Sequence, residues 1–522
     1  MRLMLLIALA VSARASTHAE LVPFFKDWRD FQRPRMVNGV PDYSPAAMRA
    51  KQLALKGWQQ KLAAFNMTGW SIVEKVDYNL VRAEMNGLDF DLRVLRPWSR
   101  NPFFYATVFA QESDTPLHEG PHVYGALELW NYRFPLTPQD TDEILTKLNA
   151  VPRLLTAAKA NLIEDSKDLF AIGVWQKRRE SQALAELAAR DPKLAPAARA
   201  AQAAVDEFAG WLERRAKTMT KSAGIGVENY NWYLKNVHLV PYTWAELVTL
   251  MERELARTLA SMRLEEQRNR NLPALALPRS VEELDRRNNE AIDTLMNFQR
   301  QLFTVKDYMN LDRLRGVRQL LPAESLDVFS NVEYRDSIPM KTHAIHWIEK
   351  QRLDREPHSS PIRSSRLLYN IWDSRSEGFA TAWEEVTMNA GLFDQRPRAR
   401  ELIYFMGAVR AIRGLADLKF HSGEFTLEQA KRFIVEKTPH GWFNPKGNTV
   451  WVDMAIYATQ PSYGTTYLGG KIAFDRLLAD MKPMRFRDLM DAFFSVGVIP
   501  MSMVRWEMTG RDDEARRLGV RQ

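Results

Sequence analysis

Cysteine is absent from this 522-residue sequence, and histidine occurs only nine times. Without cysteine the chain cannot form disulfides, thiolate zinc sites, iron–sulfur clusters or a thiol nucleophile. Any metal site must therefore be built from a few histidines and carboxylates. Glycine and proline are also few, at 24 and 26 residues, while hydrophobic residues make up 46% and charged residues 26%. This balance is typical of a globular chain and excludes a collagen-like or disordered one.

Long hydrophobic runs are missing beyond the N-terminus. Residues 3–11 form a short apolar segment after Arg2, and Ala13-Arg14-Ala15 follows the small-x-small pattern of a signal-peptide cleavage site. A membrane-spanning helix needs about 20 apolar residues, so this segment is too short to be one. We therefore predict a signal peptide over residues 1–15, no transmembrane segment, and export to the periplasm or the medium. A merely apolar N-terminus is the alternative.

A strong excess of one charge sign is also missing. The formal net charge is +8, and Arg2 and Arg14 would leave with the signal peptide. Basic residues are interleaved with acidic ones, as in Asp285-Arg286-Arg287, and no Lys/Arg stripe runs along the chain. Nucleic acid is therefore not an expected partner.

Helix signals dominate the remaining sequence. Ser44-Pro45 is typical of an N-cap followed by proline at the first helical position. Helical spacing recurs over 376–391, 394–418, 464–481 and 485–497. The Ser/Thr-x-x-Glu/Gln spacing of a capping box begins at Thr243, Ser280 and Thr426.

Alternating strand patterns are few, so we predict a mostly α protein. Residues 16–522 are expected to form a single large helical domain. Its two lobes would meet at a break in the proline-punctuated segment near 271–279. A central cleft between the lobes is the expected place for a site.

Two groups of histidines compete as a metal site. The first, His118-Glu119-Gly120-Pro121-His122, matches the H-E-x-x-H zinc signature. That signature needs a helix, which the proline inside the motif disfavours. His118, Glu119 and His122 are therefore the alternative site rather than the favoured one.

The second group combines His343 and His346 with Glu377. Histidines three residues apart on a helix can face one point, and Glu377 falls on another predicted helix. Two histidines and a glutamate form a zinc site with an open fourth position. The alternative interpretation is a polar layer between packed helices, in which the histidines hydrogen-bond to carboxylates. Glu349 lies one further turn along from His346.

The C-terminal third also carries a family resemblance. Short motifs follow one another in this third, in residues 377–385, 389–394, 410–421, 461–471 and 486–500. These segments resemble those of the domain of unknown function 885 family, and together they cover about residues 330–510. The N-terminal two thirds match more loosely, mainly over 149–162. The resemblance implies an exported bacterial protein with a helical, gluzincin-like metallopeptidase fold.

The resemblance also implies a zinc cofactor and a peptide substrate or ligand. His343 and His346 stand where the family has its metal motif, H-E-x-x-P-G-H or a close variant. Glu377 matches the third ligand. His421 and Tyr467 match positions near the cleft that would hold a substrate or a developing oxyanion.

One departure from the family bears on catalysis. Ala344 replaces the glutamate that would act as general base, the two histidines are closer together, and the Pro-Gly pair is missing. Losing a general base costs about 10²–10⁴-fold in rate. Glu349 or Glu384 would have to substitute as catalytic residues. Two hypotheses follow: a metallopeptidase-like hydrolase with an unusual site, and a catalytically inactive pseudo-peptidase that binds peptides or a protein partner in the same cleft.

Overall fold

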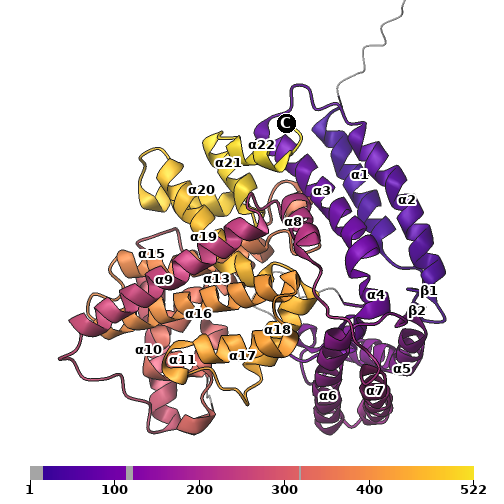
Figure 1. The fold of residues 1–522 in the computed structure, drawn as a ribbon, viewed down its shortest axis with the longest axis horizontal. Coiled ribbons are helices and arrows are strands. Elements are labelled where there is room, and N and C mark those ends of the chain that lie inside the picture. Colours follow the sequence, from indigo (N-terminus) through magenta and orange to yellow (C-terminus); the bar gives the residue numbers. More distant parts are fainter. Residues whose placement is uncertain (1–15, 113–121, 317–318) are drawn as a thin grey trace, which may run out of the picture.

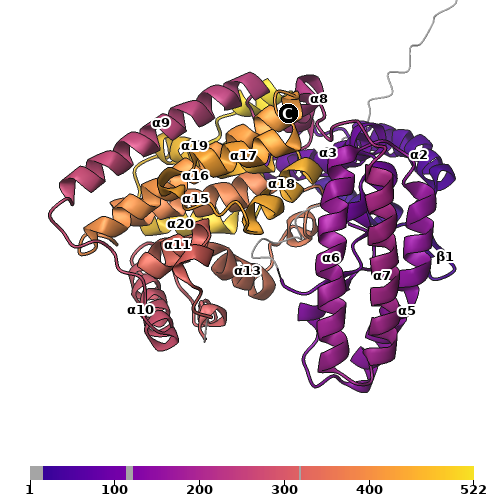
Figure 2. The same cartoon turned by 60° about the horizontal axis from the view of Figure 1, so that its bottom comes forward.

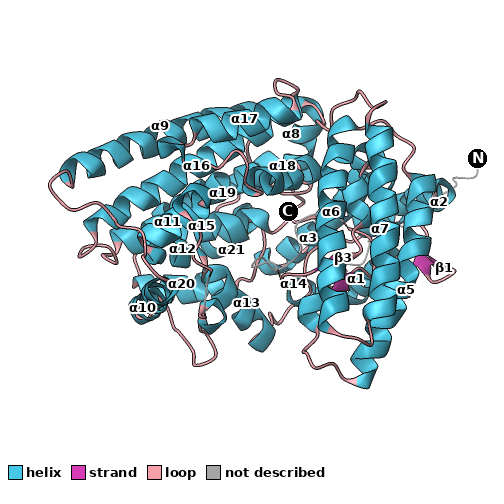
Figure 3. Cartoon of the chain, turned by 90° about the horizontal axis from the view of Figure 1, so that it is seen from below, coloured by secondary structure: helices cyan, strands magenta, loops and turns pink. Residues whose placement is uncertain are grey.

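The computed structural model describes residues 16–112, 122–316 and 319–522. The predicted signal peptide, along with His118 and Glu119, lies outside these residues. The regular structure is almost entirely helical (Figure 3), which confirms the mostly α prediction. Within the part of the chain that is described, no helix is long and apolar enough to cross a membrane.

The first part of the chain forms α1 to α8, which mostly gather on one side of the molecule (Figure 1). Their bounds are α1 His18–Gln32, α2 Pro45–Ala63, α3 Ile72–Phe90, α4 Pro97–Arg100, α5 Pro138–Asn161, α6 Lys167–Arg190, α7 Ala195–Ala216 and α8 Val227–Asn236. Helices α5, α6 and α7 run side by side as a bundle (Figure 2).

Two short strand pairs accompany these helices. Strand β1 (Met36–Val37) pairs antiparallel with β2 (Val40–Pro41), and β3 (Val108–Phe109) pairs parallel with β4 (Leu127–Glu128). Because each strand has only two residues, the pairs do not build a sheet layer. The β1–β2 pair closes a tight turn, whereas the β3–β4 pair joins two segments that are separated in the sequence.

The remaining helices carry the residues of the predicted site. Their bounds are α9 Trp244–Arg268, α10 Val281–Gln299, α11 Val328–Arg335, α12 Ser337–His343, α13 Ile345–Arg355, α14 Pro361–Ser364, α15 Asp373–Asn389, α16 Pro397–Ser422, α17 Leu427–Lys437, α18 Thr449–Thr459, α19 Tyr463–Asp480, α20 Phe486–Ser495, α21 Met501–Thr509 and α22 Asp513–Leu518. Helix α16 packs against α9 and α19, and α15 packs against α19. The predicted break near 271–279 falls in the loop between α9 and α10.

The predicted helix starts are found in the structure. The Ser44 hydroxyl accepts a hydrogen bond from the Ala47 amide, and capping boxes begin α9 at Thr243 and α17 at Thr426. Helix α10 differs in detail: Ser280 caps it, but the Glu283 carboxylate accepts the amide of Arg279. Each of these caps satisfies amides that the first helical turn leaves without partners.

Glycines set the close approach of α15 and α19. A Cβ atom on Gly378 would lie 2.3 Å from the Cα of Gly470, a distance that no side chain tolerates. The two backbones can therefore touch only because both positions are glycine. Since Gly378 follows Glu377 directly, this contact fixes where that carboxylate lies.

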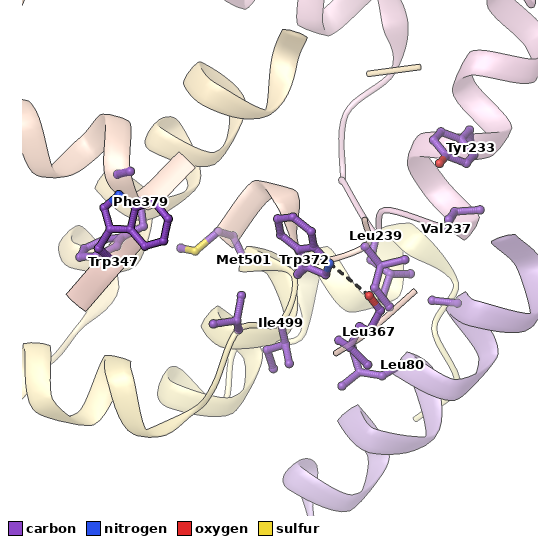
Figure 4. Close-up of a cluster of buried hydrophobic side chains, with 14 of the residues drawn as sticks. Leu80, Tyr233, Val237, Leu239, Trp347, Leu367, Trp372, Phe379, Ile499 and Met501 are labelled. Carbon is purple, nitrogen blue, oxygen red and sulfur yellow. Dashed lines mark hydrogen bonds between the residues drawn. The ribbon is translucent and has the colours of Figure 1, made fainter. Parts of the chain in front are cut away.

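Most buried hydrophobic residues belong to one cluster, which extends from Leu21 in α1 to Val520 after α22. A second cluster joins α17 and α18 to α16. Figure 4 shows the part around Trp372, whose indole Nε1 donates to the carbonyl of Leu367 at 3.1 Å. Because Trp372 immediately precedes α15, this packing anchors the start of the helix that carries Glu377.

Candidate metal centre

His343, His346 and Glu377 come together between α12, α13 and α15. The Nε2 atoms of His343 and His346 each lie 3.3 Å from Oε2 of Glu377. The two histidines do not share one continuous helix, because α12 ends at His343 and α13 begins at Ile345. The break at Ala344 turns the two rings to a centroid distance of 5.0 Å and a near-perpendicular angle of 83°.

The three side chains fit a zinc ion in donor type and spacing. Each offers one ligand atom, and these atoms all lie within 4.8 Å of one another. Ligand atoms bound tetrahedrally to zinc at about 2.0–2.2 Å are about 3.3–3.6 Å apart. Both nitrogen–oxygen distances in the cluster match this separation. Imidazole and carboxylate are also ligands that zinc accepts.

Each of the three side chains has an outer partner. Nδ1 of His346 lies 3.2 Å from the Ser376 hydroxyl, and the Tyr463 hydroxyl donates to Oε1 of Glu377 at 2.6 Å. Such partners fix the orientation of a ligand and leave its remaining donor atom directed at the metal.

His343 has two neighbours at Nδ1. Oε1 of Glu384 lies 3.0 Å away and Nη2 of Arg410 lies 3.1 Å away. A neutral histidine that binds metal through Nε2 carries its proton on Nδ1, so Glu384 is the acceptor there. Arg410 donates to both oxygens of Glu384, at 2.6 and 2.8 Å, and holds that carboxylate in place.

The electrostatics of the cluster favour ionised groups. Burial and the charge of Arg410 lower the pKa of His343, but the carboxylates of Glu377 and Glu384 outweigh them and raise it to about 9. Burial raises the pKa of Glu377, but hydrogen bonds from His343 and His346 hold it well below its usual value. A metal ion binding here must therefore displace a proton from His343.

The two glutamates that we expected as candidate bases both have arginine partners. Glu384 is in the cluster but is paired with Arg410. Glu349 lies elsewhere, buried against Arg375, whose guanidinium donates to both of its oxygens. Each carboxylate accepts two hydrogen bonds from a buried arginine, so each already serves as the counter-ion of that arginine.

The other two expected residues occupy different places. The Tyr467 ring lies 6.4 Å from that of His343 and 5.8 Å from the Arg410 guanidinium, so it borders the cluster. The Nε2 atom of His421 lies 2.8 Å from the carbonyl oxygen of Tyr457 and 3.4 Å from a carboxylate oxygen of Asp417. The structure does not bring it into contact with the cluster.

Sequence reasoning missed the outer partners Ser376, Arg410 and Tyr463. Ser376 precedes Glu377 and Tyr463 lies one helical turn before Tyr467, so both stood beside residues that the sequence did single out. The role of Arg410 depends on how α16 packs against α12 and α15, and no local pattern reports that packing. Of the alternative site, only His122 is described, with its ring 5.1 Å from that of Phe109.

Solved structures share the fold. A "putative lipoprotein of unknown function" from Shewanella oneidensis superposes with a TM-score of 0.67 at 16% identity, covering 95% of this chain and 100% of the other. A "putative lipoprotein" from Colwellia psychrerythraea gives 0.59 at 12% identity, covering 97% and 100%. No curated protein sequence matches the chain.

Residues 35–309 match the family described as bacterial protein of unknown function, DUF885. This range ends before His343 and covers the part of the chain where the resemblance was expected to be looser. The match spans more than half of the sequence. The chain therefore belongs to the DUF885 family of bacterial proteins of unknown function.

Proposed function

We propose that this chain is a zinc-dependent hydrolase that acts on peptides, with His343, His346 and Glu377 as the metal ligands. The observation that supports the proposal is the convergence of three suitable ligand atoms, each on a side chain oriented by an outer partner. A zinc site requires its ligand atoms to face one point at separations like these, whereas a polar layer between packed helices does not.

When bound, zinc would polarise a substrate carbonyl and lower the pKa of a coordinated water. The chain's own residues would orient the ligands and the substrate. Glu384 and Arg410 hold His343, and Tyr463 holds Glu377. His343 is the most exposed of the three ligands, at 16% of its side chain, so substrate would approach from its side. Tyr467 borders that side and would contact the bound peptide.

A second candidate is a zinc-binding pseudo-peptidase that holds peptides without cutting them. The observation that favours it concerns the expected bases among the described residues: Ala344 has no carboxylate, and Glu349 and Glu384 are both paired with arginines. Bound zinc would remain in this case, but water would lack its proton acceptor.

Metal analysis combined with a peptide-cleavage screen separates the candidates. Purified protein is dialysed against zinc, its metal content is measured, and a mixed peptide library is incubated with it and followed by mass spectrometry. The hydrolase predicts one zinc per chain and cleavage that His346→Ala abolishes. Bound zinc without cleavage favours the pseudo-peptidase. Absence of zinc in the wild-type protein refutes both.

We also propose that the mature protein is exported to the periplasm or the medium. The apolar segment over residues 3–11 and the description of both structural neighbours as lipoproteins support this. Cell fractionation with N-terminal sequencing should find a mature protein that begins at Ser16 outside the cytoplasm. A variant without residues 2–15 is the control and should stay inside. A wild-type protein found in the cytoplasm with residues 1–15 intact refutes the proposal.

A further inference from the structure

Residues 33–64, which form the β1–β2 hairpin and α2, make up one edge of the molecule. This edge lies on the right in all three views, with α9 on the left (Figure 1, Figure 2 and Figure 3). The Lys51 ammonium donates to the carbonyl of Gln32 at 2.7 Å, and the Asp42 amide donates to the carbonyl of Arg35 at 2.8 Å. These bonds hold the base of the hairpin beside the first turns of α2.

The 33–64 edge carries far more positive than negative charge. It has six basic residues and one acidic residue, Asp42. Because the basic residues are spaced along the sequence, they do not form a run of adjacent cations. Four of them are exposed and have no carboxylate partner among the residues that the structure describes. These four are Arg35, Arg49, Lys56 and Lys61.

Apolar side chains are exposed among these cations. Met36 and Val37 in β1 are 51% and 39% exposed, and Leu53 on α2 is 72% exposed. Arg49, Leu53 and Lys56 are spaced four and three residues apart, so they share one face of α2. A single exposed leucine is ordinary on a protein surface. Here it lies between two cations without ion-pair partners, on a helix that contains no acidic residue.

We propose that the 33–64 edge binds the surface of a membrane that contains anionic phospholipids. The cations would contact the lipid phosphates, and Met36, Val37 and Leu53 would enter the boundary between headgroups and acyl chains. An acidic protein or a nucleic acid would also match the charge, but neither would need the exposed apolar side chains. Attachment would be at the surface, since no described helix can span a membrane. The proposal does not depend on zinc binding or hydrolysis.

Sedimentation of the purified mature chain with lipid vesicles tests this proposal. We expect binding to vesicles of phosphatidylglycerol and phosphatidylcholine in equal parts, and at least 10-fold weaker binding to phosphatidylcholine alone. Arg49→Gln/Lys56→Gln should weaken binding to the anionic vesicles about 30-fold, because each basic residue near such a surface contributes about 5-fold. Met36→Gln/Leu53→Gln leaves the charge unchanged and should weaken binding about 10-fold, less than full burial of both side chains would give.

Two variants on α9 are the matched controls. Leu264→Gln removes a leucine that is 71% exposed, and Arg253→Gln/Arg263→Gln removes two exposed cations. Both should bind like the wild type, and circular dichroism checks that every variant is folded. Absence of binding to the anionic vesicles would overturn the proposal, as would equal weakening by the control variants. Binding that Met36→Gln/Leu53→Gln leaves unchanged would also overturn it, because the edge would then recognise charge alone, as on an acidic macromolecule.

Discussion

Glu349 is where the structure and the expected catalytic role conflict most directly. Its carboxylate is 3% exposed and takes two hydrogen bonds from Arg375, which is fully buried. Glu349→Gln keeps the shape but removes the charge that balances Arg375. Removing one partner of a buried ion pair costs about 3–5 kcal/mol of folding free energy, because the other charge stays buried and unpaired.

The aromatic rings around Arg375 determine where in this range of about 3–5 kcal/mol the loss of folding free energy should fall. The Arg375 guanidinium lies 3.9 Å from the ring centroid of Phe493 and 4.9 Å from that of Phe379. Desolvated cation–π contacts contribute up to about 2 kcal/mol and remain after the substitution. We therefore expect a loss near 3 kcal/mol. Replacing both partners by apolar residues, in Glu349→Leu/Arg375→Met, should recover most of it.

Urea unfolding followed by circular dichroism measures this effect. The variant should unfold at a lower urea concentration, while the folded variant keeps the zinc content of the wild type. A Glu349→Gln protein of unchanged stability that loses hydrolysis by 100-fold or more would refute this reasoning. That result would identify Glu349 as the base.

Three further predictions follow from single contacts. Glu384→Gln should weaken zinc binding by about 10- to 100-fold in a chelator competition, as for other outer-shell partners, whereas its neighbour variant Glu385→Gln should not. Burial lowers the pKa of His421 to about 4, so the unfolded chain, with a pKa near 6.5, takes up a proton there first as pH falls. Stability should therefore drop by about 3 kcal/mol between pH 6.5 and 4 in thermal unfolding, and His421→Asn should flatten that dependence. Gly378→Ala should greatly reduce the yield of folded protein, since its methyl group would collide with the Gly470 backbone; normal folding would contradict the close contact.

The sequence predicted the local features of this fold well. Helix starts at Ser44, Thr243 and Thr426 depend on interactions within four residues, so the capping pattern alone locates them. The three candidate ligands also followed from spacing and from the family resemblance. The break at Ala344 did not, because an i, i+3 pair predicts one continuous helix and the turn there is set by packing of α12 and α13 against α15.

The roles of the glutamates depended on contacts that spacing cannot report. Glu349 follows His346 by three residues, so a helical pattern places both on one face. Its actual partner, Arg375, is 26 residues away on another helix. Glu384 likewise meets Arg410 across the packing of α15 and α16. Whether a carboxylate is available as a base therefore depends on the tertiary structure. The local sequence pattern identified Glu349 and Glu384 as candidates but could not show which of them is free.

The contacts of Arg410 explain how the proposed metal ligands can stay oriented without a glutamate at position 344. Arg410 orients Glu384, which orients His343, so this chain of contacts serves ligand geometry and does not depend on a residue at position 344. If the proposed zinc site is correct, binding and catalysis are separable: the proposed ligands keep their partners, while Ala344 offers no proton acceptor. Lack of that acceptor alone would lower the rate by about 10²–10⁴-fold without lowering zinc affinity. Zinc content and turnover should consequently respond to different substitutions, with Glu384 governing the first.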